Sequence, residues 1–409
     1  MTMARKQWHG SPITQSGPST LHSGVTSLEL GLLILLVTLV LAGLLLVYSA
    51  TYYLSRQIFD DPFYFVRRQA GAALVGTLAL LGLWRMDYRR LQRLSIPLML
   101  LGVASLIAVL LIGEERLGAR RAFSGGSFQP SEFVKPIIIL YLATWLPTKG
   151  ERLREFDRGF LPFVMVLSVV VIPIFLQPDL GTGLLIGMVA AWMFVASGAT
   201  FTQVLLGLAL GAGMFGLLVQ VHPHAMARLI DYLEALRGPE EAHVHLTAVW
   251  QAIRAGGLFG KGPGAMLYTL SGNVPLPHSD SAFAVVGEAF GFIGVMGLIT
   301  LLSLWVVLGF HVARQACDAF GGLLALGVTL WIAWQGLINL GGLTGVIPFS
   351  GIPFPFISYG GSALLSELIG AGMLLSVARR RWDEDLDRRG RDWRAHLSSA
   401  GRRGGAPGR

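Results

Sequence analysis

Long apolar runs alternate with short polar segments over most of this chain. Apolar runs of about 20 residues are typical of helices that span a membrane. Ten runs predict such helices, several of them shorter than ideal: Leu28–Tyr48, Ala70–Trp84, Ile96–Ile112, Phe133–Leu146, Phe160–Leu176, Leu180–Ala196, Phe201–Val221, Ser281–Phe310, Phe320–Leu340 and Ser362–Ala378. The pattern therefore predicts an all-α, polytopic integral membrane protein with ten transmembrane helices.

Three segments fall outside this pattern. Residues 1–26 are polar and rich in Ser, Thr and Gly, and residues 381–409 mix Arg with Asp before a Gly-rich end. The first is expected to be a disordered tail, and the second to be a cytoplasmic tail that is disordered beyond a short juxtamembrane helix, because both have little apolar surface to bury. Residues 27–380 are expected to form the membrane domain. Within it, residues 222–280 form a large extracytoplasmic loop between the seventh and eighth spans. No removable signal peptide is expected.

The composition agrees with a membrane protein. Hydrophobic residues make up 53% of the chain and charged residues only 14%, whereas a soluble domain carries about 25% charged residues. The single cysteine, Cys317, excludes a disulfide framework and any multi-cysteine metal site. The net charge of +8 at first suggests nucleic-acid binding. Because the basic residues lie at the ends of apolar runs and in the C-terminal tail, membrane topology explains them better, and no nucleic-acid partner is expected.

The distribution of Lys and Arg predicts the orientation of the chain. Ten spans place both termini on one side of the membrane, and that side carries 21 of the 32 Lys and Arg residues. Basic residues are enriched in cytoplasmic segments of membrane proteins. Both termini are therefore expected to be cytoplasmic, and the long loop is expected to face outward.

Cations gather in one outward-facing segment, GARRAFSGGSFQPSEFVKP (residues 118–136). Arg120 and Arg121 precede a Gly-rich turn, and Lys135 lies one turn into the fourth span. Three cations near one opening suit an anionic ligand, and the arginine guanidinium matches phosphate. Alternatively, the arginines contact lipid headgroups and the following Ser131 and Glu132 cap a helix. A lysine inside a span is costly, so Lys135 is expected to have a partner or a function.

Four carboxylates at the ends of spans or inside them are candidates for a role in chemistry. Asp179, in the turn QPDLGTG, is expected to cap the sixth helix. Asp280 lies where the external loop enters the eighth span, and it either caps that helix or takes a proton from a hydroxyl nucleophile. Glu288 lies roughly 12 Å deeper. Glu288 and Glu367, in the tenth span, are either functional or hydrogen-bonded to a neighbouring helix.

Two further segments are notable. Residues 339–365 contain too many Gly and Pro residues for a regular span. They are expected to form a loop that is buried in protein or lines a cavity. His222 and His224, and His243 and His245, form two H-x-H pairs; a solvated loop is favoured for them over a metal site.

Five motifs occur in the order expected of the SEDS family, whose best-known members are FtsW and RodA: YSAT…DDPFYFVRRQ, GARR…FQPSEFVK, QPDLGTG, HSDSAFAVVGEAFGFIG and GGLTGVIPFSGIPFPFISYGGS. The chain resembles this family from Tyr48 to about Arg380, and DDPFYF favours the FtsW type. The resemblance implies a ten-span peptidoglycan glycosyltransferase in the bacterial cytoplasmic membrane. Such an enzyme polymerises lipid II at the outer face, for cell division or elongation. The partners it implies are a class B penicillin-binding protein, other division or elongation proteins, and membrane lipids.

The resemblance also implies the site. The family's essential aspartate lies in a His-Thr-Asp-Phe context, which matches residues 278–281, so Asp280 becomes the catalytic candidate. A divalent cation, Mg²⁺ or Mn²⁺, is expected to assist, although the sequence shows no dedicated set of ligands. No organic cofactor is expected. The residues assigned to substrate binding are Arg120, Arg121, Lys135, Glu288, Ser358 and Tyr359.

The chain departs from the family pattern at four positions around these motifs. Ala122 replaces the usual Trp, Ser281 replaces an aromatic residue, Ala289 replaces a second glutamate and Leu276 replaces an acidic residue. These departures retain Asp280 but bring substrate affinity and rate into question. A flippase or transporter of lipid-linked precursor, using the same cations, and a non-catalytic scaffold of the division machinery remain alternative functions.

Overall fold

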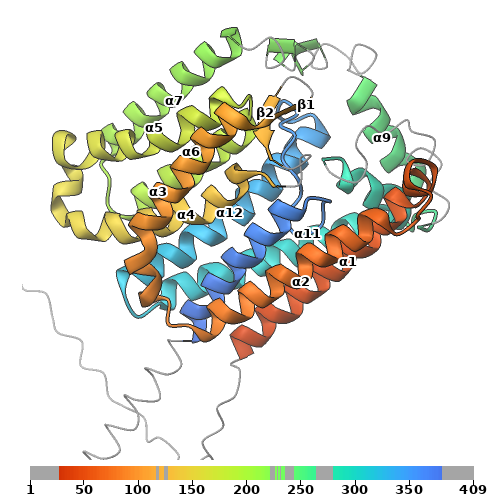
Figure 1. Ribbon diagram of the computed structural model, residues 1–409, viewed down its shortest axis with the longest axis horizontal. Helices are drawn as coiled ribbons and strands as arrows, with labels where there is room; N and C mark the ends of the chain where they lie inside the picture. The colour runs from red at the N-terminus through yellow and green to blue at the C-terminus, as the bar shows by residue number, and fades with distance from the viewer. Residues whose placement is uncertain are drawn as a thin grey trace, which may run out of the picture.

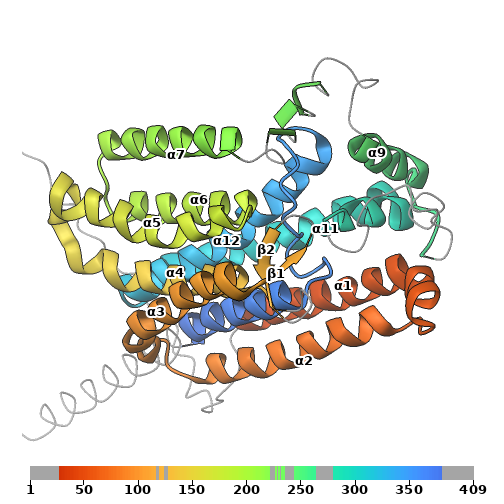
Figure 2. The ribbon, with the colours of Figure 1, turned by 45° about the horizontal axis from the view of Figure 1, so that its top comes forward.

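The computed structural model describes residues 27–116, 119–123, 128–221, 226–227, 229–230, 232–234, 244–263 and 280–379. Long helices lie side by side over this part of the chain (Figure 1, Figure 2). The two expected tails, most of the expected loop at 222–280 and the side chains of the histidine pairs lie outside the described residues.

All the described helices but one overlap the predicted runs; the exception, α9 (Val244–Gly256), lies within the segment 222–280 that was expected to be an external loop. The helices are α1 Ser27–Phe59, α2 Tyr64–Arg85, α3 Arg89–Ile112, α4 Pro130–Trp145, α5 Leu161–Leu176, α6 Leu180–Ala196, α7 Phe201–Val221, α9 Val244–Gly256, α11 Ala282–Gln315, α12 Ala319–Thr344 and a last helix, Gly361–Arg379. The short helices η1 (Leu146–Arg154) and η2 (Phe156–Phe160) connect α4 to α5. Within the described residues, six helices are long and apolar enough to cross a membrane. The protein therefore has a helical, multi-pass membrane fold.

A short β-hairpin departs from the all-α prediction. Strands β1 (Glu114–Arg116) and β2 (Ala119–Ala122) pair antiparallel between α3 and α4. Once the chain leaves the helix at Gly113, its backbone groups need new hydrogen-bond partners, and the paired strands supply them. Strands of three and four residues are too short for a period-two pattern to be recognised in the sequence.

Two helices form the centre of the bundle. In α12 and the last helix, 72% and 83% of the residues in the most apolar stretch are buried, against 28–33% for α1, α3, α5 and α11. α12 packs against α4, α6 and α11. The outer helices expose broad apolar faces instead, as expected for helices in contact with lipid tails.

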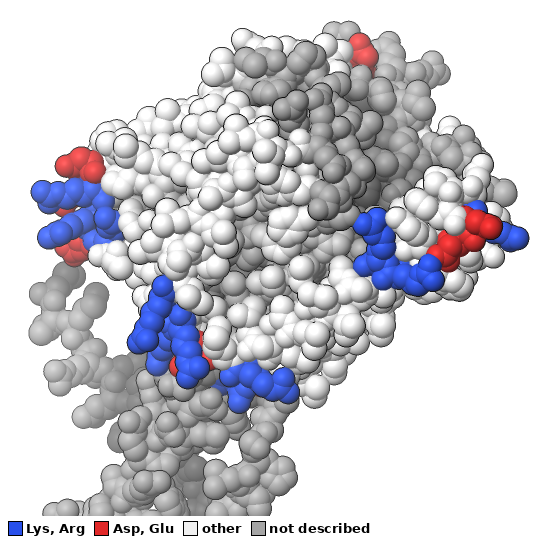
Figure 3. Space-filling view, viewed as in Figure 1, with Lys and Arg blue, Asp and Glu red and all other residues white. Residues whose placement is uncertain are grey.

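Charged side chains gather at the two ends of the bundle, with a wide uncharged surface between them (Figure 3). At one end, a carboxylate oxygen of Asp318 accepts hydrogen bonds from the Tyr88 hydroxyl (2.8 Å) and from Nε of Arg89 (2.9 Å). The connection between α2 and α3 therefore meets the connection between α11 and α12. The Lys and Arg count predicted that these two connections share a side of the membrane.

Candidate active site

Asp280 lies at the opposite end of the bundle, where α11 begins. Ser281, not Asp280, holds the N-cap position of α11, and it makes no side-chain capping hydrogen bond. Asp280 is half-buried, and its carbonyl oxygen accepts a hydrogen bond from Nδ2 of Asn339 (3.0 Å). The same amide nitrogen donates to the carbonyl oxygen of Ile352 (2.7 Å). One buried side chain of α12 therefore ties the start of α11 to the loop that follows α12.

That loop, residues 345–360, folds into the protein as the sequence predicted. Phe354 and Phe356 are almost completely buried. Phe356 has a left-handed backbone, with φ of 61°, and its amide donates to Oε2 of Glu367 (2.7 Å). A Cβ atom on Gly43 of α1 would lie 2.5 Å from the carbonyl oxygen of Phe356. Glycine at position 43 is therefore what allows α1 to pack directly on this loop.

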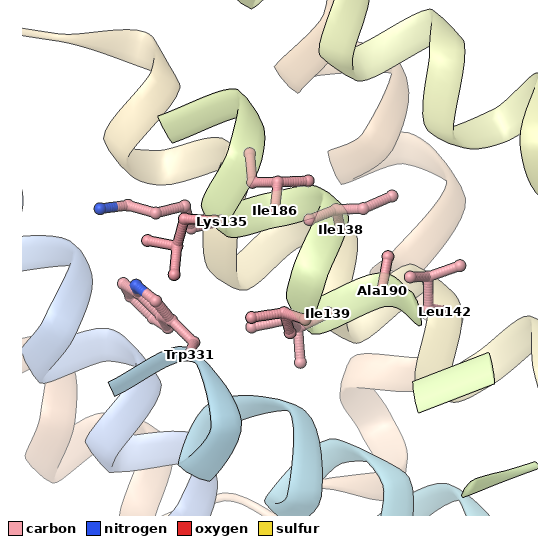
Figure 4. A pocket seen from close by; sticks show the side chains of 9 residues that line it. Lys135, Ile138, Ile139, Leu142, Ile186, Ala190 and Trp331 are labelled. Carbon is pink, nitrogen blue, oxygen red and sulfur yellow. The ribbon is translucent and has the colours of Figure 1, made fainter. Parts of the chain in front are cut away.

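Lys135 has buried partners, which confirms the expectation for a lysine inside a span. Its Nζ lies 2.7 Å from Oε2 of Glu132, one turn earlier on α4, and donates to Oε1 of Gln335 in α12 (3.3 Å). The ammonium also lies 5.3 Å from the centre of the Trp331 ring. Lys135 and Trp331 come together from α4 and α12 beside an apolar pocket (Figure 4). In this conformation, protein groups neutralise and hold the lysine charge.

Gln335 connects this ion pair to the last helix. Its Oε1 also accepts from Nε1 of Trp331 (2.7 Å). Its Nε2 donates to Oε1 of Glu367 (2.7 Å) and to the carbonyl oxygen of Pro353 (3.1 Å). These contacts fix the orientation of the amide, because the oxygen faces donors and the nitrogen faces acceptors. Glu367 is therefore hydrogen-bonded to a neighbouring helix, one of the two alternatives that the sequence left open.

Asp179 caps α6, as predicted. Its Oδ1 accepts from the Thr182 amide (3.2 Å), and its Oδ2 accepts from Nε2 of Gln129 (3.1 Å) and from Oγ of Ser131 (3.3 Å). The backbone N–H of Gln129 donates a hydrogen bond to Oγ of Ser362 (3.1 Å). The starts of α4, α6 and the last helix therefore meet at one place.

Ser358 and Tyr359 lie where the loop meets α2. Oγ of Ser358 accepts from the Phe354 amide (2.9 Å), and its carbonyl oxygen accepts from Nε2 of Gln69 (3.2 Å). The ring of Tyr359 is half-buried, edge-to-face with Phe65 at 5.2 Å. The Ser358 hydroxyl therefore stabilises the loop, and the Tyr359 ring is the more accessible of the two side chains.

Glu288 is completely buried in α11, on the part of the helix that meets α9. Its carbonyl oxygen accepts from the Lys261 amide (3.0 Å). A Cβ atom on Gly256 would lie 1.9 Å from the carbonyl oxygen of Gly287, so α9 ends in direct backbone contact with α11. Gly291, with φ of 66°, interrupts α11 one turn later. Glu288 thus lies at an irregular, closely packed segment.

Arg120 and Arg121 belong to β2, and the structure describes their backbone alone. β2 lies against α3 and α4, so the backbone of both arginines is placed at the same end of the bundle as the start of α4. Within the described residues, no group of three or more His, Cys, Asp or Glu side chains is arranged to hold a metal ion.

Sequence reasoning missed the amides that organise the site. Gln335 and Asn339 are spaced four residues apart on α12, so they lie on the same face of that helix, and both are buried. Polar residues with this spacing inside an apolar run were the available signal, because a buried polar group must find hydrogen-bond partners.

The fold and this arrangement define a helical membrane protein whose charged and amide side chains converge beneath one end. The family model described as "Cell cycle protein", of FtsW, RodA and SpoVE, matches residues 30–382. The chain belongs to this family.

Individual relatives are similar to this chain over nearly their full length. The chain is 34% identical over 356 residues to a probable peptidoglycan glycosyltransferase FtsW of Geobacter metallireducens, covering 86% of this chain and 95% of that protein. It is 36% identical over 359 residues to stage V sporulation protein E of Bacillus subtilis, covering 87% and 98%.

Solved structures have the same fold. A chain from a peptidoglycan synthase complex, described for its coordination of polymerization and crosslinking, matches with a TM-score of 0.70 and 28% identity, covering 86% of this chain and 98% of that chain. The rod shape determining protein RodA of Thermus thermophilus matches with a TM-score of 0.63 and 27% identity, covering 86% and 97%.

Proposed function

We propose that this protein is a peptidoglycan glycosyltransferase that polymerises lipid II into glycan strands at the outer face of the cytoplasmic membrane. The names of its relatives support the activity. The observation that carries the proposal is the placement of Asp280. This carboxylate is half-buried at the start of α11, and Asn339 fixes its backbone against the loop 345–360. A carboxylate held between protein and water suits a general base.

The chemistry requires one base and a good leaving group. Asp280 takes the proton from the acceptor sugar 4-hydroxyl, whose oxygen forms a bond to C1 of the donor sugar. The bond between C1 and the polyprenyl diphosphate breaks, and the electron pair leaves with the diphosphate. Arg120 and Arg121 stabilise the charge that develops there, since fixed positive charge at a leaving group lowers the barrier.

Lys135 has a different part in this proposal. Because Glu132 and Gln335 hold its ammonium, Lys135 acts as a fixed charge beneath the site and orients α4. Glu288 and Ser358 support the segments around Asp280, and the Tyr359 ring contacts the substrate.

A divalent cation, Mg²⁺ or Mn²⁺, is part of the proposal. Mg²⁺ is commonly bound by one or two carboxylates together with substrate phosphates. The donor diphosphate would supply most of the oxygens, and the Asp280 carboxylate, which also has to accept the proton, would supply at most one of them. The cation would add positive charge at the leaving group.

The proposed topology has ten spans and two cytoplasmic termini, with residues 222–280 outside. Asp318 and Arg89 lie together at one end of the helix bundle, which the proposal takes as cytoplasmic. Asp179 and Ser131 lie together at the other end, which it takes as the outer one. The proposed partner is a class B penicillin-binding protein, which fits the similarity to a chain of a polymerization and crosslinking complex. Other proteins of division or elongation are expected to join it.

Reconstitution tests this function. The full chain, co-purified with a class B penicillin-binding protein, is incubated with lipid II, and glycan strands are measured. Asp280→Asn is expected to lower the rate by about 10²–10⁴-fold, the usual contribution of a general base. Asp157→Asn, at an exposed position in η2, is the matched control and keeps the wild-type rate.

Other outcomes would identify another function. Equal polymer from the wild type and Asp280→Asn rejects the site. Movement of lipid II across vesicles without polymer favours the flippase. Neither activity, with normal recruitment of division proteins, favours the scaffold.

A further inference from the structure

Aromatic residues gather where α1 ends and α2 begins, at one end of the bundle (Figure 1). Seven of the eighteen residues 48–65 are Phe or Tyr, whereas aromatic residues make up 10% of the chain. The segment includes the motif DDPFYF, which lies outside the catalytic site described above. We call the seven residues the aromatic platform: Tyr48, Tyr52, Tyr53, Phe59, Phe63, Tyr64 and Phe65.

Four rings form a continuous row that leads from the end of α1 to the loop 345–360. Phe59 and Tyr64 stack with their ring centres 3.7 Å apart. Both meet the Phe65 ring edge-to-face, at 5.8 and 5.4 Å. Phe65 in turn meets Tyr359 of the loop at 5.2 Å. Because 42% of Phe59 remains exposed, the row has one end open to a ligand.

A buried glutamine of α2 fixes the row against the loop. Nε2 of Gln69 donates to the carbonyl oxygen of Ser358 (3.2 Å), and its Oε1 accepts from the Gly360 amide (3.1 Å). These two hydrogen bonds lie on either side of Tyr359 in sequence and hold its backbone beside α2. The same loop accepts the hydrogen bond through which Asn339 holds the start of α11. The platform and the catalytic candidate are therefore attached to one loop.

The length of α1 carries the platform beyond the membrane. Its 33 residues correspond to about 50 Å at 1.5 Å per residue. The hydrocarbon core of a bilayer is only about 30 Å thick, and the whole bilayer about 40–45 Å. A helix that begins at the inner surface therefore passes the outer headgroups before it ends. Aromatic residues that anchor a helix lie at the level of the headgroups, whereas Phe59 lies at the far end of α1, immediately before Asp60 and Asp61.

Arginines border the platform. Arg68 donates to the Tyr64 hydroxyl (3.1 Å), and its guanidinium lies 5.6 Å from the centre of the Tyr64 ring. Arg67 forms an ion pair with Asp61. Residues 48–69 contain three arginines and two aspartates, so this surface has a net positive charge. It therefore suits a ligand that combines anionic groups with flat faces that pack on aromatic rings.

A peptidoglycan glycan strand has both properties. The C–H bonds on one face of a sugar ring carry a slight positive charge, which complements the negative face of an aromatic ring. The peptide stems end in carboxylates, which match guanidinium groups. Because the rings lie in a row, a strand of several sugars contacts more of them than a single disaccharide does.

We propose that the aromatic platform binds the glycan strand that the protein makes and retains it between successive additions. The proposal rests on the proposed function, because it assigns a surface to the polymer produced by that reaction. The platform thereby determines how many sugars are added before the strand is released, and leaves the rate of a single transfer to the catalytic site.

Binding of a strand that carries no lipid tests the proposal without turnover. The full chain with Asp280→Asn is placed in nanodiscs of phosphatidylethanolamine and phosphatidylglycerol. It is titrated with a fluorescent peptidoglycan strand of four disaccharides with their peptide stems, and separately with a single labelled disaccharide-peptide. Fluorescence polarisation measures both. The strand is expected to bind at least tenfold more tightly than the single disaccharide.

Conservative variants separate ring stacking from membrane anchoring. Phe59→Leu, and independently Phe63→Leu, keep an apolar side chain at exposed positions but remove the ring. Each is expected to weaken strand binding at least fivefold, whereas Phe59→Tyr keeps the ring and leaves binding unchanged. Phe201→Leu, at an exposed position at the start of α7, is the matched control and also leaves binding unchanged. Melting curves verify that each variant is folded.

Polymerisation provides the second measurement. With Asp280 restored, Phe59→Leu and Phe63→Leu are expected to shorten the glycan strands at least twofold on average. The initial rate of lipid II consumption is expected to stay within twofold of the wild type, since neither ring belongs to the catalytic site. Gel electrophoresis of the strands and the consumption of labelled lipid II measure the two quantities.

Three results would overturn the proposal. They are equal affinity for the strand and the single disaccharide, undiminished strand binding in both folded leucine variants, and loss of the co-purified penicillin-binding protein from these variants while strand binding is unchanged. If the wild type polymerises lipid II while no strand binds, this proposal alone is wrong. If strands bind as expected while the wild type and Asp280→Asn polymerise equally, the proposed catalytic site is wrong and the glycan surface stands.

Discussion

The ammonium of Lys135 lies 2.7 Å from a carboxylate oxygen of Glu132. Both residues belong to α4, and both side chains are almost completely buried in the protein. Removing two charges from water is costly, and their mutual attraction offsets this cost only when both are present. The pair therefore links the start of α4, near the proposed site, to the central helix α12 through Gln335.

Lys135→Met is expected to destabilise the protein by about 3–5 kcal/mol, because it leaves the Glu132 carboxylate buried and unpaired. The double variant Lys135→Met with Glu132→Gln removes both charges and is expected to recover much of that loss. Thermal unfolding in detergent measures both. A double variant no more stable than Lys135→Met would show that the pair has no such coupling.

Glu367→Gln is expected to destabilise the protein by about 1–3 kcal/mol, the cost of leaving a buried hydrogen-bonding group without its partner. Both oxygens of Glu367 accept hydrogen bonds, from Gln335 and from the Phe356 amide. A glutamine keeps one acceptor and points an N–H₂ group at another donor. A flip of the Gln335 side-chain amide would not restore the lost hydrogen bond, because its oxygen already accepts from Lys135 and Trp331.

The measurement for Glu367→Gln is again the melting curve, together with glycan polymerisation. Ser366→Ala, beside it on the same helix, removes a hydroxyl that donates only to the Ala363 carbonyl oxygen within the helix (2.8 Å). It is expected to cost less than Glu367→Gln. If the two changes cost the same, the Glu367 contacts are not specific.

Gly43→Ala is expected to separate α1 from the loop 345–360. The new Cβ would lie 2.5 Å from the carbonyl oxygen of Phe356 and 3.0 Å from the Cα of Ile357, both backbone atoms that cannot rotate away. Overpacking of this kind costs about 1–3 kcal/mol. Protease accessibility of the loop and the melting temperature report the change.

Gly71→Ala in α2 is the matched control. A Cβ atom at this position meets nothing within 4 Å. Alanine is favoured over glycine inside a helix by up to about 1 kcal/mol, so the melting temperature should stay the same or rise. Equal losses at positions 43 and 71 would contradict the packing argument.

The cluster of Tyr88, Arg89 and Asp318 predicts how stability depends on pH. Burial, with the hydrogen bond to Asp318, raises the pKa of Tyr88 above its ordinary value of about 10. Although partial burial opposes it, hydrogen bonds from the Gly321 amide, Tyr88 and Arg89 hold the pKa of Asp318 below its usual value.

The sign of each effect follows from linkage. The Tyr88 contribution is fully present below about pH 10 and is lost as pH rises through the raised pKa. The Asp318 contribution is present above about pH 4 and is lost as pH falls through the lowered pKa. Melting temperatures of the wild type and Tyr88→Phe are therefore expected to differ most near neutral pH and to converge at alkaline pH. A difference that stays constant from pH 7 to pH 11 would contradict this.

The catalytic candidate and its surroundings were predictable to different degrees. Asp280 became the candidate through the resemblance of its His-Ser-Asp motif to the family's, and the capping role of Asp179 was predicted from the turn in which it lies. The interactions of Lys135 were foreseen only as a requirement for some partner. Its partner on the same helix, Glu132, is three residues away in sequence, whereas Gln335 is 200 residues away.

The sequence by itself determined the helical membrane architecture, because runs of apolar residues with basic ends have one stable arrangement in a bilayer. It also determined the loop after α12, since its Gly and Pro residues cannot continue a span. Only the tertiary structure decided that Asn339 joins Asp280 to Ile352 and that Glu367 fixes the Phe356 turn. The physical reason is that a buried polar group requires a partner without specifying which one, and the packing of distant helices makes that choice.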